Sequence, residues 1–439
     1  MLGACAHYEP RPAAPERFAA AYDATTLGPA PAGGAWTDEA LLAVALDHSA
    51  AVKQARATYR AARAAARASR VPPAITLTLV AEYSKDAGGT TPWLYSGLLD
   101  IPLDHGARRS TRLETADLTA LQALYDYAEA IWTVRSAVAH AHIDRLAADR
   151  QIALAEQAVH IRAERAQLLE NRIRAGEDAR PAGLTAQTDL AAARKRLQDV
   201  TVLRSQADLA LGKALGVPAA ALKDIVLSPL GDEAPLPAAA DLAAWRQEAA
   251  LRRRDVLRAL ADYDMAEQAL KLEVAKQYPD VHLGPGYTFE RGQHKIPFDL
   301  TLVLPPQDLN QANIKAAEAK RAEAAAKLDA AQAGVITAVD QSSAVLTQSR
   351  VGLARAVSQD LPLVERADAA ARRSLAAGAS DRTDAEATEA AVIDAKLTAL
   401  DAWRTAWIAA ADLEDALRRP SPGESAVLEA AVRRAGESQ

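Results

Sequence analysis

The sequence predicts a mainly α-helical protein with a small β part, built as two tandem copies of a coiled-coil hairpin of long helices. Three observations lead to this fold class. Proline and glycine, the strongest breakers of regular structure, are absent from long stretches such as residues 107–175. Each half contains two stretches in which apolar residues alternate with a period of two, which indicates a β-hairpin. Landmarks of the first half recur 202 to 206 residues later, which indicates a duplication.

Composition restricts the class of protein further. Half of the 439 residues are apolar and 25% are charged, but only 4% are aromatic, so few large rings are available to fill a thick globular core. The 51 basic and 57 acidic residues give a net charge of −6 with both signs interspersed, which disfavours nucleic acid as a partner. No stretch approaches the roughly 18 consecutive apolar residues of a spanning helix, which excludes a polytopic helical membrane protein.

Residues 1–35 are expected to form an extended leader, because prolines and glycines are frequent between residues 8 and 34. Within it, Leu2-Gly3-Ala4-Cys5 resembles the end of a bacterial lipoprotein signal, whose cysteine carries lipid. A complete signal would have a basic region and an apolar run before Leu2. Cys5 is the only cysteine and cannot form an internal disulfide, so it is either lipidated or an inert terminal thiol.

Two repeats follow the leader, each in the order helix, two strands, very long helix, turn, helix. Repeat 1 is expected at residues 36–217 and repeat 2 at 241–419, with a connector at 218–240 and a C-terminal tail at 420–439. The run 107–175 would be about 100 Å long as one helix, which requires neighbouring helices packed along it. The expected strands lie at about 74–83, 93–103, 281–289 and 295–304, and the expected turns, called the tips, at about 176–183 and 378–384.

Four landmarks align the repeats. The pairs are Tyr59 and Tyr263, Pro73 and Pro279, Pro102 and Pro305, and Gly176 and Gly378, with separations of 204, 206, 203 and 202 residues. Such agreement makes a tandem duplication the best explanation. The second copy is less regular, and a bend is expected near Pro362 inside its long helix.

The four strands have the length of membrane-crossing strands, about nine to eleven residues. Their lipid-facing residues are expected to be Ile75, Leu77, Leu79, Tyr83, Trp93, Tyr95, Tyr287, Phe289, Phe298 and Leu300. Open sheet edges are not viable in lipid, so several chains must share one barrel. Eight strands from a dimer would leave no lumen, whereas twelve from a trimer would. We therefore expect a trimeric 12-stranded β-barrel continued by an α-helical barrel.

Three short pieces of sequence carry a resemblance to a known family. They are Ile101-Pro102-Leu103-Asp104-His105-Gly106-Ala107-Arg108-Arg109 at the first strand exit, Leu304-Pro305-Pro306-Gln307-Asp308-Leu309-Asn310-Gln311-Ala312-Asn313-Ile314 at the second, and Arg172-Ile173-Arg174-Ala175-Gly176-Glu177 with Ala186-Gln187. Together with the duplication, they make the chain from about Trp36 to Arg419 resemble the outer-membrane efflux proteins, or TolC-like channels. The second strand exit is most similar to the heavy-metal and cation efflux lipoprotein branch.

The resemblance implies a homotrimeric conduit across the outer membrane and periplasm of a Gram-negative bacterium. In the family, the periplasmic tip docks with an adaptor, or membrane-fusion protein, and with an inner-membrane pump. Export is then passive in this subunit, which is not an enzyme and has no cofactor. The exported substrate does not follow from the sequence.

The tips contain the candidate docking and gating residues. Gly176 and Gly378 can end helices at positive φ, and Arg180 and Arg382 are either adaptor contacts or solvated loop charges. The acidic residues of the second tip are Asp381, Asp384 and Glu386. In a trimer they would form rings that favour cations and gate the pore, or they are simply helix-capping and first-turn acids.

An enzyme is disfavoured because no catalytic motif is present. His140 and His142 would point about 200° apart on a helix and cannot share a metal. The paired Glu-x-x-His motifs of helical-bundle metalloenzymes are absent. The other alternative is a soluble coiled-coil scaffold without a channel, which has no need of four amphipathic strands.

Overall fold

A computed structural model describes residues 7–31, 33–85, 91–104, 106–237, 239–290 and 292–437. Cys5, the expected lipidation site, lies outside the described residues. The chain divides into two compact units, each assembled from separate stretches of sequence. We call them the helical unit (Met1–Lys53, Ala130–Arg246 and Thr337–Gln439) and the sheet unit (Gln54–Glu129 and Gln247–Ile336).

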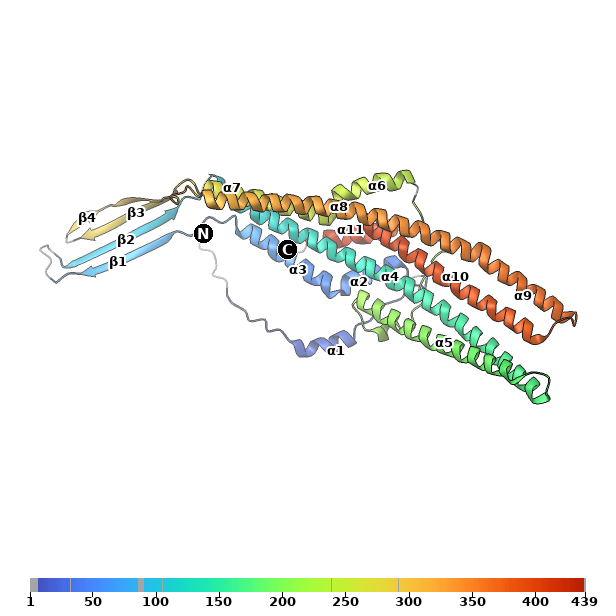
Figure 1. The fold of residues 1–439 in the computed structure, drawn as a ribbon. Helices are drawn as coiled ribbons and strands as arrows, with labels where there is room; N and C mark the ends of the chain where they lie inside the picture. The colour runs from blue at the N-terminus through green and yellow to red at the C-terminus, as the bar shows by residue number, and fades with distance from the viewer. Residues whose placement is uncertain are drawn as a thin grey trace. The chain divides into compact units, whose positions relative to one another are not determined.

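The sheet unit contains all the described strands, which lie side by side in Figure 1. They are β1 (Thr76–Tyr83), β2 (Trp93–Pro102), β3 (Asp280–Glu290), β4 (Gln293–Lys295) and β5 (Phe298–Val303). All pairings are antiparallel: β1 pairs with β2, β2 with β3, and β3 with both β4 and β5. The strand expected at about 295–304 is therefore two strands, because Pro297 in the gap lacks the N–H of a ladder residue.

Each strand pair is connected to helices of the same repeat. These helices are α3 (Ala50–Ala68) and α4 (Gly106–Ala175) in repeat 1, and α7 (Arg254–Ala275) and α8 (Gln311–Arg355) in repeat 2. Helix α4 has 70 residues without interruption, as the absence of proline and glycine predicts. Both α4 and α8 begin in the sheet unit and end in the helical unit.

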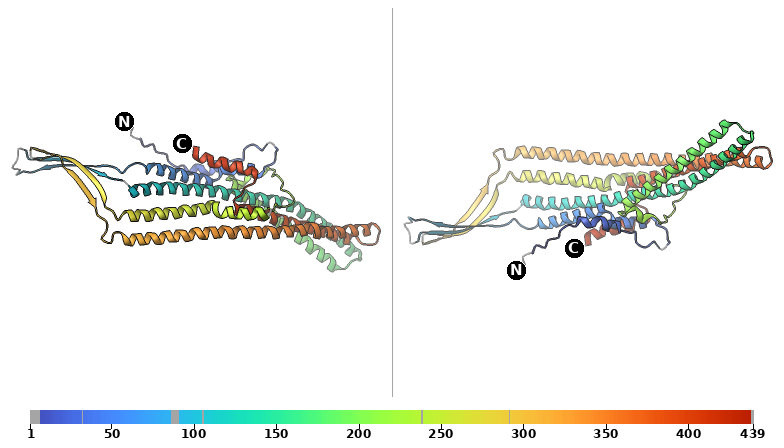
Figure 2. Two further views of the ribbon diagram at one scale, coloured as in Figure 1. Left: turned by 90° about the horizontal axis from the view of Figure 1, so that it is seen from above. Right: turned by 90° about the horizontal axis from the view of Figure 1, so that it is seen from below.

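The helical unit holds most of the remaining elements. They are a 3₁₀ turn (Pro15–Arg17), α1 (Phe18–Asp23), α2 (Asp38–His48), α5 (Arg180–Leu215), a second 3₁₀ turn (Ala219–Leu222), the first part of α6 (Ala239–Arg252), a π-helix (Ala356–Asp360), α9 (Leu361–Ala376), α10 (Arg382–Leu417) and α11 (Pro422–Glu437). Figure 2 shows α4 with α5, and α9 with α10, as two hairpins of antiparallel helices. The π-helix ends at Asp360, two residues before Pro362, so the irregularity of the second long helix occurs where the sequence places the proline.

The repeats correspond in detail. Helices α5 and α10 both have 36 residues. Three pairs of residues with positive φ occupy equivalent positions: Gly106 and Asn310, Gly176 and Gly378, and Gly216 and Arg418. Each pair is 202 or 204 residues apart, so the same backbone turn recurs even where glycine has been replaced.

Other expected segments also differ from the structure. The first helix of each repeat is broken, at Ser49 in repeat 1 and at Arg253 in repeat 2. Ser49 Oγ accepts a hydrogen bond from the backbone N–H of Val52 at 3.4 Å, so it caps a new helix. The leader is not wholly extended, because it contains the first 3₁₀ turn and α1.

The C-terminal tail is also helical. Ser421 and Glu424 form a capping box in which the Ser421 N–H donates to Glu424 Oε2 at 3.0 Å and the Glu424 N–H donates to Ser421 Oγ at 3.5 Å. Pro422, the first residue of α11, suits a helix start because its missing N–H would have no helical partner. Both tip turns are shorter than expected. Pro181 lies inside the first turn of α5, and α10 begins at Arg382 directly after its N-cap, Asp381.

Helix α10 packs antiparallel along α4 in the helical unit. Trp132 Nε1 donates to Asp415 Oδ1 at 2.5 Å, and Arg404 Nε donates to Asp144 Oδ1 at 2.7 Å. Further along, Arg162 Nη2 donates to Asp394 Oδ2 at 2.6 Å. One buried apolar cluster of these two helices consists of Ala158, Ile161, Ala390, Ile393 and Leu397. Alanines therefore allow the two helices to approach closely, and ion pairs fix their register.

Asn310→Gly is expected to destabilise the sheet unit. Asn310 is buried, and its Nδ2 donates to the backbone oxygen of Glu273 at 2.9 Å and to its Oε2 at 2.8 Å. Glycine keeps the positive φ of 63°, as Gly106 does in repeat 1, but removes these bonds. We expect a loss of about 1–3 kcal/mol in the free energy of unfolding, measured in urea. Asn310→Ala adds strain of about 1–2 kcal/mol, so a smaller loss in the alanine variant than in the glycine variant would contradict this explanation.

Candidate functional site

The sheet has one apolar face and one polar face. Side chains alternate along a strand, and directly paired residues of neighbouring strands share a face. The register therefore places together the pairs Leu77 and Leu99, Tyr83 and Trp93, Tyr95 and Phe289, Gly97 and Tyr287, Leu283 and Leu300, and Pro285 and Phe298. Nine of the ten expected lipid-facing residues lie in strands on this face, and Ile75 directly precedes β1 in the same alternation.

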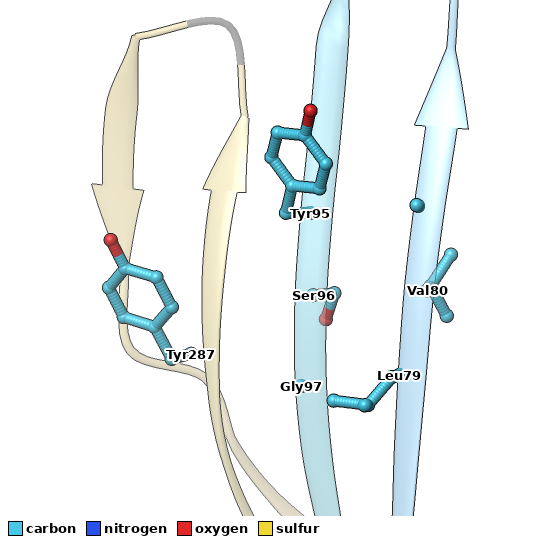
Figure 3. A pocket seen from close by; sticks show the side chains of 7 residues that line it. Leu79, Val80, Tyr95, Ser96, Gly97 and Tyr287 are labelled. Atoms are coloured by element: carbon cyan, nitrogen blue, oxygen red, sulfur yellow. The ribbon is translucent and has the colours of Figure 1, made fainter.

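The apolar face is exposed. Leu79 is 73% exposed and Phe298 is 68% exposed, values far above those of core residues. Near the centre of the sheet, Gly97 leaves a shallow depression of about 460 Å³ that Leu79, Tyr95 and Tyr287 surround (Figure 3). A Cβ atom at Gly97 would approach Leu79 Cδ2 to 3.3 Å, so the leucine side chain lies over the glycine.

Aromatic rings gather where β1 ends and β2 begins. Tyr83 and Trp93 meet edge to face with their centroids 5.1 Å apart, and Trp93 stacks on Tyr95 at 5.8 Å. Rings with an apolar body and a polar group are typical of the boundary between membrane and water.

The opposite face of the sheet is mainly polar. Ser96 and Thr288 share a hydrogen bond of 3.0 Å, and Lys295 Nζ donates to Glu290 Oε2 at 2.6 Å. The two faces of the sheet thus differ in polarity.

The sheet has two open edges among the described residues. β1 pairs only with β2, β5 pairs only with β3, and every residue of both strands is exposed. Unpaired N–H and C=O groups along an edge are a template for pairing with another strand.

The glycines of both tips end helices as expected. Gly176 and Gly378 have φ values of 80° and 70°. The N–H of Glu177 donates to the oxygen of Arg172 at 2.9 Å, and the N–H of Ala379 donates to that of Ser374 at 2.9 Å. These are the bonds of a Schellman motif, which satisfies the last carbonyl groups of a helix.

The two tip arginines occupy equivalent positions but have different surroundings. Arg180 is exposed at the start of α5, and no hydrogen bond or ion pair joins it to another described residue. Arg382 Nε donates to Glu386 Oε1 at 2.9 Å, one helical turn further along α10. Leu184 stands where Glu386 stands in repeat 2, so Arg180 has no equivalent acid.

The acids of the second tip have three different surroundings. Asp381 is the N-cap of α10, where its side chain accepts from the Thr383 N–H at 3.4 Å, and it also forms an ion pair with Arg172. Asp384 is exposed in the first turn of α10. Glu386 is only 6% exposed. The ion pair between Arg172 and Asp381 joins the two tips within one chain, which spacing in the sequence could not reveal.

The two histidines of α4 face different partners. His140 Nε2 lies 2.9 Å from Asp412 Oδ1, whereas the buried His142 contacts Asp38 and the backbone oxygen of Ser228. No cluster of three or more metal-ligating side chains occurs in the part of the chain that the structure describes.

The free energy of unfolding is expected to depend on pH through His140. Its contact with Asp412 raises the pKa of His140 above the ordinary value of 6.5, although burial opposes the shift. This stabilisation is fully present below pH 6.5 and is lost as pH rises through the raised pKa. Thermal unfolding of His140→Asn should therefore differ from that of the unsubstituted protein at pH 6 and much less at pH 9. A difference independent of pH, or one that survives in Asp412→Asn, would contradict this assignment.

None of the described helices is long and apolar enough to cross a membrane.

The fold defines a class of protein in which hairpins of long helices are joined to amphipathic strands. Comparison with known proteins identifies this class. The model of the outer membrane efflux protein family matches residues 41–217. The resemblance to this family is thereby confirmed, and the family is one of transport components rather than enzymes. No curated protein matches the chain in sequence.

Solved structures share the fold over both repeats. A membrane protein from Pseudomonas aeruginosa is 22% identical, with 86% of this chain and 92% of that chain covered and a TM-score of 0.69. The outer membrane protein VceC from Vibrio cholerae is 18% identical, with 86% and 95% covered and a TM-score of 0.70. The MtrE outer membrane channel of Neisseria gonorrhoeae is 19% identical, with 87% and 88% covered and a TM-score of 0.72. Each of these solved structures is less than 25% identical to this chain, and together they show that the chain shares their fold.

Proposed function

We propose that the chain is one subunit of a homotrimeric outer-membrane channel through which substrates are exported passively. The observation that carries the proposal is the combination of an exposed apolar sheet face with two open edges. The apolar face would contact outer-membrane lipid, and the polar face would line the pore. Edge β1 of one chain would pair with β5 of the next, because open edges are not viable in lipid.

The number of chains follows from the strand count. β4 and β5 occupy one side of β3 in succession, so each chain contributes four strand positions. Three chains would supply twelve strands, enough for a water-filled lumen, whereas eight strands from a dimer would enclose only side chains. The long helices would continue the conduit through the periplasm, and lipid on Cys5 would add an anchor.

The tips are the proposed docking surface for a periplasmic adaptor, which connects the channel to an inner-membrane pump. Arg180 is the better candidate contact, because it is exposed and forms no hydrogen bond or ion pair with another described residue, whereas Arg382 already interacts with Glu386. The proposed gate includes Asp381, whose contact with Arg172 would hold the tips together, and the exposed Asp384.

Mass and conductance test the proposal together. Each chain has a mass of 46.5 kDa, so three chains should give about 140 kDa of protein in detergent, by threefold closure. The same material should aggregate when detergent is removed and should form discrete ion-conducting channels in a planar bilayer. A monomer or dimer that remains soluble without detergent and conducts no current would instead support a coiled-coil scaffold.

A further inference from the structure

Three arginines lie in the first two turns of α4, where the strands of repeat 1 give way to helix. Arg108 Nη2 donates to the backbone oxygen of Tyr278 at 3.0 Å, and Arg108 also pairs with Asp280. Arg112 forms an ion pair with Asp104 and donates to the backbone oxygen of Ser69. Both guanidinium groups therefore hold together parts of the sheet unit.

Arg109 differs from its two neighbours. It is exposed, and no hydrogen bond or ion pair joins it to another described residue. The two nearby carboxylates, Asp104 and Asp280, are already paired with Arg112 and Arg108. Three arginines against two carboxylates leave one positive charge uncompensated, and Arg109 carries it.

A pocket of about 330 Å³ lies beside Arg109. Its lining residues are Pro72, Pro73, Pro102, Leu103, Asp104 and Arg109. The Leu103 N–H donates to the oxygen of Val281 at 3.0 Å, which continues the pairing of β2 with β3. By alternation Leu103 therefore belongs to the apolar face, so the pocket adjoins the edge of that face. It combines apolar walls with the guanidinium of Arg109 and the carboxylate of Asp104, whose charge Arg112 already pairs.

Repeat 2 shows that the fold does not require this cation. The residue equivalent to Arg109 is Asn313, 204 residues later, and its Nδ2 donates to Asn310 Oδ1 at 2.6 Å. Arg108 and Arg112 are likewise replaced by Ala312 and Ala316. The start of α8 in repeat 2 therefore forms without an exposed arginine. Because the equivalent start of α4 does not need Arg109 either, the guanidinium of Arg109 is available for a ligand.

We propose that the pocket at Arg109 binds the phosphate of an anionic glycerophospholipid in the periplasmic leaflet of the outer membrane. The guanidinium would hold two phosphate oxygens in a bidentate contact. The prolines and Leu103 would contact the glycerol region, and the acyl chains would lie along the apolar face. This site rests on the proposed function, because only a membrane-inserted sheet places its strand ends at lipid headgroups.

Native mass spectrometry of the detergent-solubilised trimer, titrated with phosphatidylglycerol, tests the site. We expect one tightly bound lipid per chain, and about ten-fold or more weaker binding to Arg109→Asn, since hydrogen bonds to charged groups are worth at least that factor. Arg109→Lys keeps the charge but loses the bidentate contact, so its affinity should lie between those of Arg109→Asn and the unsubstituted protein. Arg252→Gln, which removes another exposed arginine, should bind as the unsubstituted protein does.

Several outcomes would overturn the inference. Equal binding of phosphatidylglycerol to Arg109→Asn and the unsubstituted protein would exclude Arg109 as the cation. Inorganic phosphate that binds as tightly as the lipid would identify a site for free phosphate instead. If Arg109→Asn fails to assemble, the unsubstituted trimer alone can be titrated with phosphatidylglycerol and with phosphatidylcholine. Equal affinity for the two lipids would contradict a site for an anionic lipid. The same spectra report the number of chains in the assembly. A trimer that binds no lipid at this pocket would overturn this inference alone. A monomer that is soluble without detergent would overturn the proposed function as well.

Discussion

Leu79→Arg is expected to abolish assembly in the outer membrane while leaving the helices folded. Leu79 lies at the centre of β1, is 73% exposed, and belongs to the apolar face of the sheet. An arginine on the lipid face near the bilayer midplane costs about 2–4 kcal/mol, and a trimer would contain three. Because the side chain is so exposed, few contacts within the chain are lost.

Thr78→Arg is the matched control for this substitution. Thr78 is the adjacent residue of the same exposed strand, but it pairs with Leu98 on the opposite face of the sheet. An arginine there should be tolerated in the lumen and should change only conductance and ion selectivity. Membrane fractionation followed by trimer detection on gels of unheated samples measures both variants. Equal recovery of both trimers in the outer membrane would contradict the assignment of the lipid face.

Arg135→Ala is expected to lower the free energy of unfolding of the helical unit by about 3–5 kcal/mol, because it leaves a buried carboxylate without its partner. The side chains of Arg135 and Glu424 are 3% and 4% exposed. Arg135 donates to both carboxylate oxygens of Glu424, at 3.1 and 2.9 Å, and also pairs with Glu414. The guanidinium lies 5.3 Å from the centroid of the Trp132 ring.

The pattern of loss distinguishes this network from ordinary packing. Arg434→Ala removes an exposed ion pair with Asp47 and should cost less than about 1 kcal/mol. In the double variant Arg135→Met with Glu424→Met, no charge remains buried in this pair, so the loss should be smaller than for Arg135→Ala. Thermal unfolding and proteolysis of α11 measure these differences. Equal losses for Arg135→Ala and Arg434→Ala would contradict the importance of the buried pair.

The Arg135→Ala effect is also expected to depend on pH. Burial raises the pKa of Glu414, although Arg135 opposes the shift. Without Arg135, protonation of Glu414 would relieve the cost of burying its charge. The difference in stability between variant and unsubstituted protein should therefore shrink as pH falls below 5.

The features predicted from the sequence depend on local periodicity. Helix α4 follows from 69 residues without proline or glycine. The apolar sheet face follows from the period-two pattern of β1 and β2, in which every second residue is apolar or glycine. Alternation also places Tyr287 and Phe289 on the same face without knowledge of the pairing, because every strand presents one apolar side.

The features missed depend on a single residue or on distant partners. The break at Ser49 arises from one side-chain cap. Helix α11 begins at the short signal Ser421-Pro422-Gly423-Glu424, which lies in the segment expected to be a C-terminal tail. The ion pair of Arg172 with Asp381 joins residues of different repeats, and only the packing of α10 on α4 brings them together. The spacing of residues along the sequence does not predict such contacts.

Disulfide cross-linking between the two open edges tests the central claim most directly. Cys5 would first be replaced by serine, and cysteine would be placed at Val80 of β1 together with Asp299, Thr301 or Val303 of β5 in turn. Neighbouring strands about 4.8 Å apart bring facing residues within the Cα separation of a disulfide. We predict covalent dimers and trimers, and nothing larger, from membrane-inserted protein for at least one pair. Cross-links that end at the dimer, or a chain that remains monomeric for every pair, would contradict a barrel closed by three copies.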